Sequence, residues 1–130
     1  MLNIVACEVI RVIDGDTIVV DRYHTARLIE KEVIIRLLGV WAPENNTIPG
    51  KELTEWLRTI LENNWVLLET NNDKRDSFGR LLGIIYPGEI ITHNKFILDR
   101  QLSYNNQINQ KLSTVTTAST FDWSTAHENI

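Results

Sequence analysis

Four charged side chains occupy positions that packing alone does not explain. Asp16 lies in a glycine turn and Arg36 inside an apolar segment, whereas Glu44 and Arg80 each follow a residue that interrupts regular structure. Carboxylate oxygens suit a hard cation such as Ca²⁺, and a second carboxylate can accept the proton of an attacking water. Guanidiniums match phosphate oxygens and stabilise the charge of a phosphoryl transition state. The four residue types together therefore predict a phosphodiester site.

Each of these residues also has a structural explanation when it is taken alone. An Asp-Gly-Asp sequence is most often just a turn, and a glutamate after proline usually faces solvent. Arg36 is harder to explain in this way, because a guanidinium on a central strand needs carboxylates or phosphates as partners. Sequence spacing alone does not show whether the four side chains converge. Their convergence depends on how the strands and the helix that carry them are arranged.

Those elements are predicted by the periodicity of the apolar side chains. Apolar residues recur along 51–63 with the spacing of an amphipathic helix, and β-branched runs bounded by turn residues predict strands. The expected order is strands at 4–13, 17–20 and 32–40, a helix at 51–63, strands at 65–69 and 81–86, and a second helix at 92–103. In the strand at 32–40 the pleat places Ile34, Arg36 and Leu38 on one face, opposite Ile35 and Leu37.

The segments around these elements are expected to be less regular. Residues 21–31 are mostly polar and are expected to form a loop or an irregular edge. The second helix is expected to begin at Thr92 as its N-cap, with Ile91 and Phe96 as a hydrophobic staple.

We divide the chain into a folded domain at 1–104 and a polar tail at 105–130. The tail begins with an amide-rich stretch, and eight of the thirteen residues from Ser113 to Thr125 are Ser or Thr. We expect Val115, Phe121 and Trp123 to dock it on this chain or on a neighbouring one. A protein partner or a homo-oligomer formed through the tail follows as a hypothesis.

Bulk composition restricts any nucleic-acid site to a local patch. The 130 residues have a net charge of −4, with 43% hydrophobic and 23% charged residues, as in an ordinary soluble domain. Gripping long duplex DNA by its backbone alone requires a broad basic surface, which this charge opposes.

The compartment is expected to be intracellular. The chain has no apolar run of about eighteen residues that could span a membrane, and its apolar opening lacks a basic leader and a small-residue cleavage site. Cys7 is the single cysteine, which excludes an intrachain disulfide and fits a reducing interior.

Three ordered motifs resemble the hallmark segments of the staphylococcal nuclease (thermonuclease) family. They are Val-Ile-Asp-Gly-Asp-Thr at 12–17, Arg-Leu-Leu-Gly-Val at 36–40 ending in Ala-Pro-Glu at 42–44, and Asp-Ser-Phe-Gly-Arg at 76–80. The resemblance covers about residues 5–103, and its element order agrees with the one above. It implies an α+β fold, namely a five-stranded OB barrel with two or three packed helices.

The resemblance also implies Ca²⁺-dependent cleavage of DNA and RNA. It makes Asp16 a metal ligand together with the backbone carbonyl of Ala42. Glu44 becomes the general base or water-positioning group, which meets the metal through water. Arg36 and Arg80 become phosphate clamps.

Asp14 and Thr17 would support the metal-binding turn. Two further positions depart from the family pattern. Trp41 stands where catalytic members carry a second metal-binding aspartate, so Ca²⁺ should bind more weakly. Its indole either packs over the barrel end or stacks on a base, which would favour single strands. Phe78 replaces a frequent tyrosine and keeps an apolar ring for substrate.

We therefore expect a nuclease that hydrolyses phosphodiester bonds of single-stranded or locally opened DNA or RNA, more weakly than typical family members. The alternative is a non-catalytic nucleic-acid-binding or assembly module of the same fold. Trp41, the acidic net charge and the polar tail favour that alternative, whereas the presence of Glu44 beside two arginines favours the enzyme.

Overall fold

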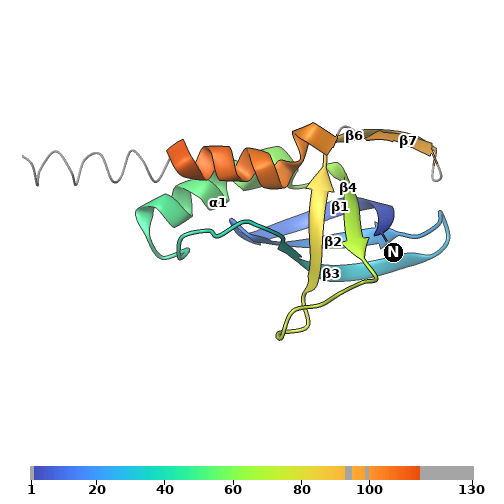
Figure 1. The fold of residues 1–130 in the computed structure, drawn as a ribbon, viewed down its shortest axis with the longest axis horizontal. Coiled ribbons are helices and arrows are strands. Elements are labelled where there is room, and N and C mark those ends of the chain that lie inside the picture. Colours follow the sequence, from blue (N-terminus) through green and yellow to red (C-terminus); the bar gives the residue numbers. More distant parts are fainter. Residues whose placement is uncertain (1, 93–94, 99, 115–130) are drawn as a thin grey trace, which may run out of the picture.

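Five strands close into a barrel in the order β1-β2-β3-β5-β4 (Figure 1). The computed structural model describes residues 2–92, 95–98 and 100–114 of the chain. The strands are β1 (Leu2–Asp14), β2 (Thr17–Tyr23), β3 (Ile29–Leu37), β4 (Trp65–Asn71) and β5 (Leu81–Tyr86). All neighbouring strands are antiparallel except β3 and β5, which run parallel. The expected five-stranded OB-type barrel of an α+β fold is confirmed.

The pleat of β3 aims Arg36 away from the barrel interior. Ile35 and Leu37 are fully buried, whereas Ile34 on the opposite face is 42% exposed. Arg36 shares this outer face, as the alternation predicts. It is therefore available to ligands without a charge entering the core.

Strand β2 extends further than the sequence indicates, so the loop predicted at 21–31 shrinks to 24–28. Asp21 is buried, and its carboxylate accepts hydrogen bonds from the backbone N–H of Glu32 at 2.9 Å and from Lys31 Nζ at 3.2 Å. Arg22 is buried between carboxylates as well. Polar residues can continue a strand when their charges are paired in this way.

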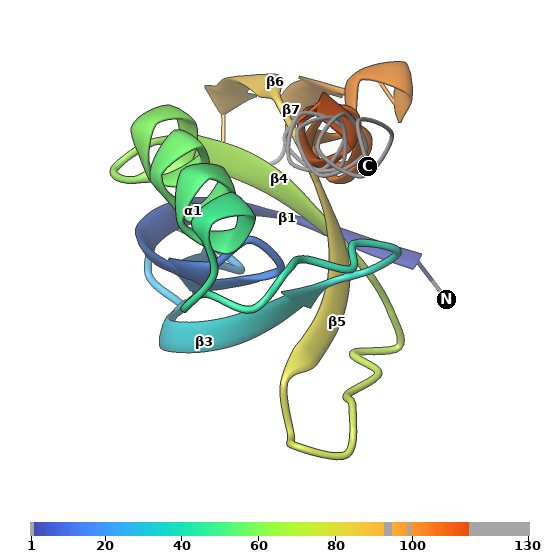
Figure 2. The same ribbon diagram turned by 90° about the vertical axis from the view of Figure 1, so that its left-hand side faces the viewer.

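Helix α1 (Ile48–Leu61) begins three residues earlier than the periodicity indicates. The hydroxyl of Thr47 caps it by accepting a hydrogen bond from Gly50 N at 3.2 Å, and proline occupies its first turn. Leu53, Leu57 and Leu61 are fully buried and close the core beside β1 (Figure 2). Helix α1 therefore supports the turn between β1 and β2 from its core side.

The prediction of a second helix at 92–103 is wrong. Strands β6 (Gly88–Thr92) and β7 (Lys95–Leu98) instead form an antiparallel ribbon, followed by the short 3-10 helix η1 (Arg100–Leu102). Two isoleucines and a threonine at 90–92 favour β-structure over a helix start. The α-helix occurs later, at 104–114.

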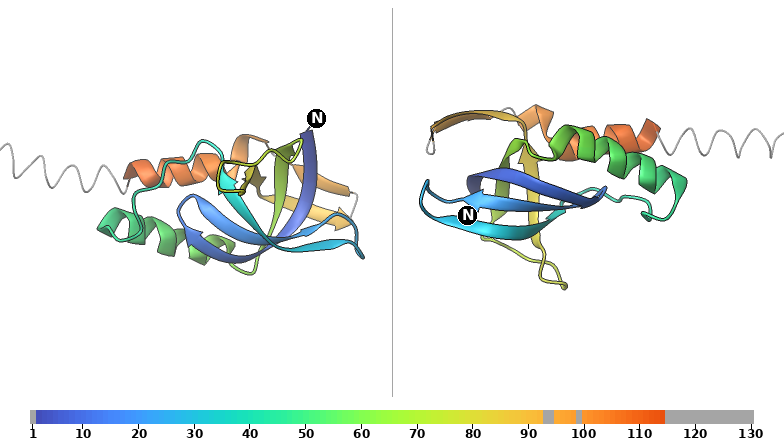
Figure 3. Two further views of the ribbon diagram at one scale, coloured as in Figure 1. Left: turned by 90° about the horizontal axis from the view of Figure 1, so that it is seen from below. Right: turned by 180° about the vertical axis from the view of Figure 1, so that it is seen from behind.

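This later helix packs against the barrel core next to α1 (Figure 3). Ile108 is fully buried, and Lys111 Nζ lies 5.8 Å from the centroid of the Trp56 ring. The amide-rich start of the predicted tail is thus helical. The proposed docking residues Val115, Phe121 and Trp123 lie outside the described residues. Among the residues described, no helix combines the length and the apolar character needed to cross a membrane.

Candidate active site

The turn between β1 and β2 presents the carboxylate of Asp16 at one end of the barrel. Asp16 N donates to Asp14 Oδ1 at 3.1 Å, and the Thr17 hydroxyl donates to Asp16 Oδ1 at 2.8 Å. A Cβ at Gly15 would lie 2.9 Å from the Cβ of Ala42, so this turn requires a glycine. The loop that contains Ala42 therefore packs directly against the Asp16 turn.

Arg36 lies next to this turn because its strand is paired with both neighbours at that level. It is opposite Thr17 on β2 and opposite Leu82 on β5. Its Nη2 is 3.6 Å from Asp16 Oδ2, and its Nη1 donates to the carbonyl of Leu37. Its side chain is 14% exposed, which leaves an edge of the guanidinium accessible.

Trp41 lies over the guanidinium of Arg36, with Arg36 Cζ 5.3 Å from the ring centroid. The indole is 80% exposed, so it does not pack over the barrel end. An exposed ring that also contacts a cation has a face available for a second planar group. Of the two interpretations from sequence, this exposure opposes packing over the barrel end, and stacking on a base stays a prediction.

Arg80 enters the same region from the loop before β5. Its Nε forms an ion pair with Asp76 Oδ2 at 2.7 Å, and its Nη1 donates to the Thr17 hydroxyl at 3.3 Å. Its Cζ lies 5.3 Å from the centroid of the Phe78 ring, which is 82% exposed. Gly79 adopts a φ of +83°, the left-handed conformation that turns the chain back toward β5.

Asp76 organises this loop with both carboxylate oxygens. Its Oδ1 accepts from the backbone N–H groups of Phe78 and Arg80, each at 2.9 Å. Desolvation alone would raise the pKa of Asp76, but the hydrogen bonds from Arg80 and Phe78 outweigh it and lower the pKa below its ordinary value. Asp76 therefore stays ionised and holds Arg80 in one orientation.

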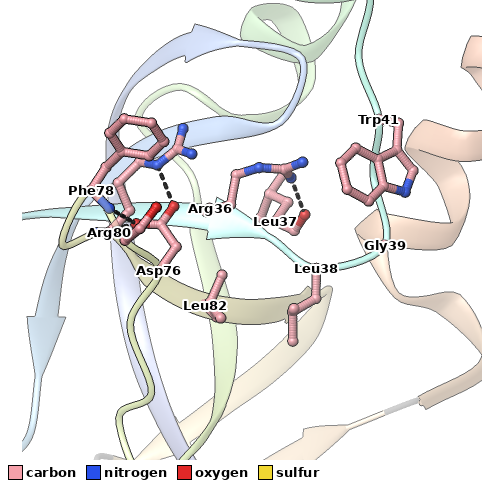
Figure 4. A pocket seen from close by; sticks show the side chains of 10 residues that line it. Arg36, Leu37, Leu38, Gly39, Trp41, Asp76, Phe78, Arg80 and Leu82 are labelled. Carbon is pink, nitrogen blue, oxygen red and sulfur yellow. Dashed lines mark hydrogen bonds and ion pairs between the residues drawn. The ribbon is translucent and has the colours of Figure 1, made fainter.

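A pocket of about 280 Å³ lies between the two arginine and aromatic pairs (Figure 4). Arg36 and Trp41 border it on one side, and Arg80 and Phe78 on the other. Its floor includes apolar side chains such as Leu82. The pocket thus combines two cations with two exposed rings, although the whole chain is acidic.

The candidate metal ligands form only part of a coordination sphere. Burial, followed by the neighbouring Asp16 carboxyl, raises the pKa of Asp14 above its ordinary value. In the described ranges no three His, Cys, Asp or Glu side chains form a cluster that could hold a metal ion. Ca²⁺ takes six to eight oxygens. The donors present fit a cation that keeps most of its shell as water.

Glu44 is not brought into contact with the other predicted residues. Its backbone carbonyl accepts from Thr47 N at 3.0 Å and from the Thr47 hydroxyl at 2.6 Å, and Gly50 packs closely against that carbonyl. Within the part of the chain that the structure describes, its exposed carboxylate forms no hydrogen bond or ion pair. The fold therefore fixes the backbone of Glu44 and leaves its side chain free to turn.

Two asparagines that we assigned to the polar tail support the site loop. Asn105 is buried, and its Nδ2 donates to the carbonyls of Leu38 at 2.8 Å and Gly83 at 3.2 Å. Asn109 Nδ2 donates to the Gly39 carbonyl at 3.0 Å. These bonds hold the turn that leads to Trp41. Their only sequence signal was an amide-rich stretch, which also suits a solvated tail.

Comparisons with known proteins show which proteins the chain is similar to. The chain is 35% identical over 94 residues to a thermonuclease of Staphylococcus hyicus, covering 68% of this chain and 52% of that protein. It is 33% identical over 91 residues to an uncharacterized endonuclease of Escherichia coli, covering 69% and 54%. A thermonuclease of Staphylococcus intermedius is 33% identical over 85 residues, covering 61% and 47%. No family model matches the chain.

The chain thus spans about half the length of the curated relatives it matches. The relatives named as nucleases agree with the closed five-stranded barrel of the structure. On these grounds the chain contains a staphylococcal nuclease-like barrel domain, which accounts for its similarity to these nucleases.

Proposed function

We propose that this chain hydrolyses phosphodiester bonds in single-stranded or locally opened DNA or RNA, in a metal-dependent reaction slower than that of typical family members. The observation that carries this proposal is the convergence of Arg36 and Arg80 on the Asp16–Thr17 turn, at distances of 3.6 Å and 3.3 Å. Two guanidiniums held at one pocket can bind a single phosphodiester between them.

The arginines supply the charge that phosphoryl transfer requires. Asp76 orients Arg80, and Asp16 contacts Arg36, so neither guanidinium has to be ordered when substrate arrives. Preorganised cations stabilise the extra negative charge of a five-coordinate transition state more strongly than flexible ones. Binding and rate acceleration are therefore assigned to the same pair.

Trp41 and Phe78 favour an unpaired substrate. Both rings are largely exposed beside the arginines. A base can stack on such a ring only after it has left the duplex stack, and stacking contributes about 1–3 kcal/mol per base. We therefore assign single strands and frayed ends as the preferred substrate.

Ca²⁺, when bound, would offset phosphate charge and orient a water. Asp16 and the backbone carbonyl of Ala42 would hold it, with Glu44 meeting it through water. Trp41 supplies no carboxylate to this set, and the contact between Asp16 and Arg36 competes with metal binding. Both features are reasons for weak affinity.

Glu44 is assigned as the group that accepts the proton of the attacking water or holds that water in line. Its carboxylate has no partner within the described residues that would have to be broken first. The short hydrogen bonds of its carbonyl anchor the loop from the main chain. The side chain is therefore not held by another group when a phosphodiester binds.

The direct test measures cleavage of a labelled single-stranded oligonucleotide and of its duplex, with millimolar Ca²⁺ and with a chelator. We expect Ca²⁺-stimulated cleavage that is faster on the single strand. Binding of the oligonucleotide without any cleavage would contradict the enzyme and support a non-catalytic binding module. Equal rates on both substrates would remove the assignment of single strands.

A further inference from the structure

A second charged cluster lies at the base of the loop that carries Arg80. Arg22 on β2 is only 2% exposed at its side chain, and its Nη2 is 3.1 Å from Asp73 Oδ1 while its Nη1 is 3.3 Å from Glu30 Oε1. Its Nε has no hydrogen-bond partner among the described residues. A buried guanidinium is tolerated only when carboxylates compensate it. The two carboxylates are therefore tightly constrained by one cation.

Asp73 lies where the chain leaves β4 in an unusual conformation. Its φ is +50° and that of Asn72 is +53°, two successive left-handed residues that are not glycine. The Thr70 hydroxyl donates to the same Asp73 Oδ1 at 2.9 Å. Desolvation would raise the pKa of Asp73, but the hydrogen bonds from Arg22 and Thr70 lower it below its ordinary value. These bonds stabilise a turn that the backbone alone disfavours.

Backbone hydrogen bonds connect this turn to the active-site loop. Leu82 N donates to the Lys74 carbonyl at 2.9 Å, and Asp76 N donates to the Arg80 carbonyl at 2.9 Å. These two bonds pair residues 74–76 with residues 80–82, so the two sides of the loop that follows Asp73 are held together up to Arg80. Figure 2 shows the connection between β4 and β5 extending beyond the barrel, so it needs an anchor at its base.

We propose that Arg22 is a positioning residue for the phosphate site, acting through Asp73 on the loop at 74–80. Asp73 transmits the constraint because it directly precedes that loop and, among the described residues, is the ion-pair partner of Arg22 nearest to it in the chain. Glu30 shares the same cation but lies on β3, at the other end of that strand from Arg36. The inference rests on the proposed nuclease function for its kinetic consequence only.

The experiment compares Asp73→Ala with Glu30→Ala in the full chain. Each variant removes one carboxylate from Arg22, and the two side chains are similarly exposed, at 45% and 40%. Arg22 is left in place, because removing a buried cation from between two carboxylates would destabilise the barrel as a whole. The first readout is backbone amide hydrogen exchange at residues 75–80. The second is kcat/KM on a single-stranded oligonucleotide.

We expect Asp73→Ala to speed exchange of the loop amides by about tenfold or more and to lower kcat/KM by about tenfold, because small displacements of a catalytic group are costly. Glu30→Ala should change both by less than about threefold at a similar Tm. Asp73→Asn, which keeps an oxygen acceptor, should restore part of the loss.

Equal exchange and equal kcat/KM in the two alanine variants would overturn the proposal, since the cluster would then be only a charge balance for Arg22. A fall in Tm of Asp73→Ala that is large enough to account for its loss of kcat/KM would overturn the proposal too. If the wild type cleaves nothing, the nuclease function fails, whereas the exchange comparison still decides whether Asp73 anchors the loop.

Discussion

The guanidinium of Arg80 donates a hydrogen bond to the Thr17 hydroxyl at 3.3 Å, although 63 residues separate the two in the chain. The same hydroxyl donates to Asp16 Oδ1 at 2.8 Å. Thr17 thus uses one oxygen to align a cation from the third motif with a carboxylate from the first. A valine of similar shape could not do so, since it has neither a donor nor an acceptor.

Replacing Arg80 by alanine should lower the cleavage rate by at least about 100-fold, the scale reported for removal of one transition-state donor. The matched control is Arg27→Ala, which removes an exposed arginine from the loop after β2 and should have little effect. Single-turnover kinetics on a labelled oligonucleotide provide the measurement. An Arg80→Ala enzyme as fast as Arg27→Ala would remove Arg80 from the site.

Replacing Glu44 by glutamine should abolish hydrolysis and leave oligonucleotide binding largely intact, because the amide cannot accept a proton while the anchoring main-chain carbonyl is unchanged. Fluorescence anisotropy gives binding, and gel-resolved cleavage gives the rate. Glu52→Gln, an exposed change on α1, is the control. Full activity in Glu44→Gln would assign the base elsewhere.

Replacing Trp41 by aspartate adds a carboxylate next to Ala42 and removes the ring over Arg36. We expect tighter Ca²⁺ binding by calorimetry and faster cleavage at limiting metal, since a hard cation gains an oxygen ligand. The preference for single strands should weaken at the same time, because a stacking surface is lost. Unchanged affinity for Ca²⁺ would show that the metal site lies elsewhere.

The loop organised by Asp76 should lose its order only in strong acid. The pKa of this carboxyl is lowered in the folded chain, so its stabilising contribution is complete above the ordinary aspartate value of about 3.9 and is lost as pH falls through the lower folded pKa. The amide signals of Phe78 and Arg80 in an NMR titration report this change directly. Asp76→Asn should show the altered signals at neutral pH. Signals that titrate at pH 5 would contradict the assignment.

The thiol of Cys7 should be unreactive in the folded chain. It is fully buried, and desolvation raises its pKa to about 12, despite the opposing charge of Arg22. Because the thiolate is the reactive species, a disulfide reagent at pH 8 should label the protein only after denaturant is added. Rapid labelling without denaturant would show that the barrel opens readily between β1 and its neighbours.

The sequence predicts the structure correctly where the periodicity of side chains within one short segment decides it. The pleat of β3 placed Arg36 correctly on the outer face, and the spacing of Leu53 and Leu57 predicted α1 with an error of a few residues at its start. Three motifs in the right order were enough to predict the barrel, which the structure and the relatives confirm.

Sequence reasoning failed where long-range pairing decides the outcome. Asp21 and Arg22 look like loop residues, and only partners on β3 and in the loop after β4 make them part of a strand. Asp76 belongs to a charged run, and its role in orienting Arg80 depends on a contact that the run itself does not predict. The structural role of a polar residue depends on its hydrogen-bond or ion-pair partner, and that partner can lie anywhere in the chain.

Asn105 has a consequence for how the protein can be shortened. Its amide satisfies the carbonyls of Leu38 and Gly83 and the backbone N–H of Ile85, groups at the seam where two parallel strands meet. A fragment that stops after the last barrel strand would expose these backbone groups to solvent. It would also expose the apolar core residues against which Ile108 packs. A self-sufficient fragment therefore has to include Asn105 and Ile108, well past the last recognisable motif.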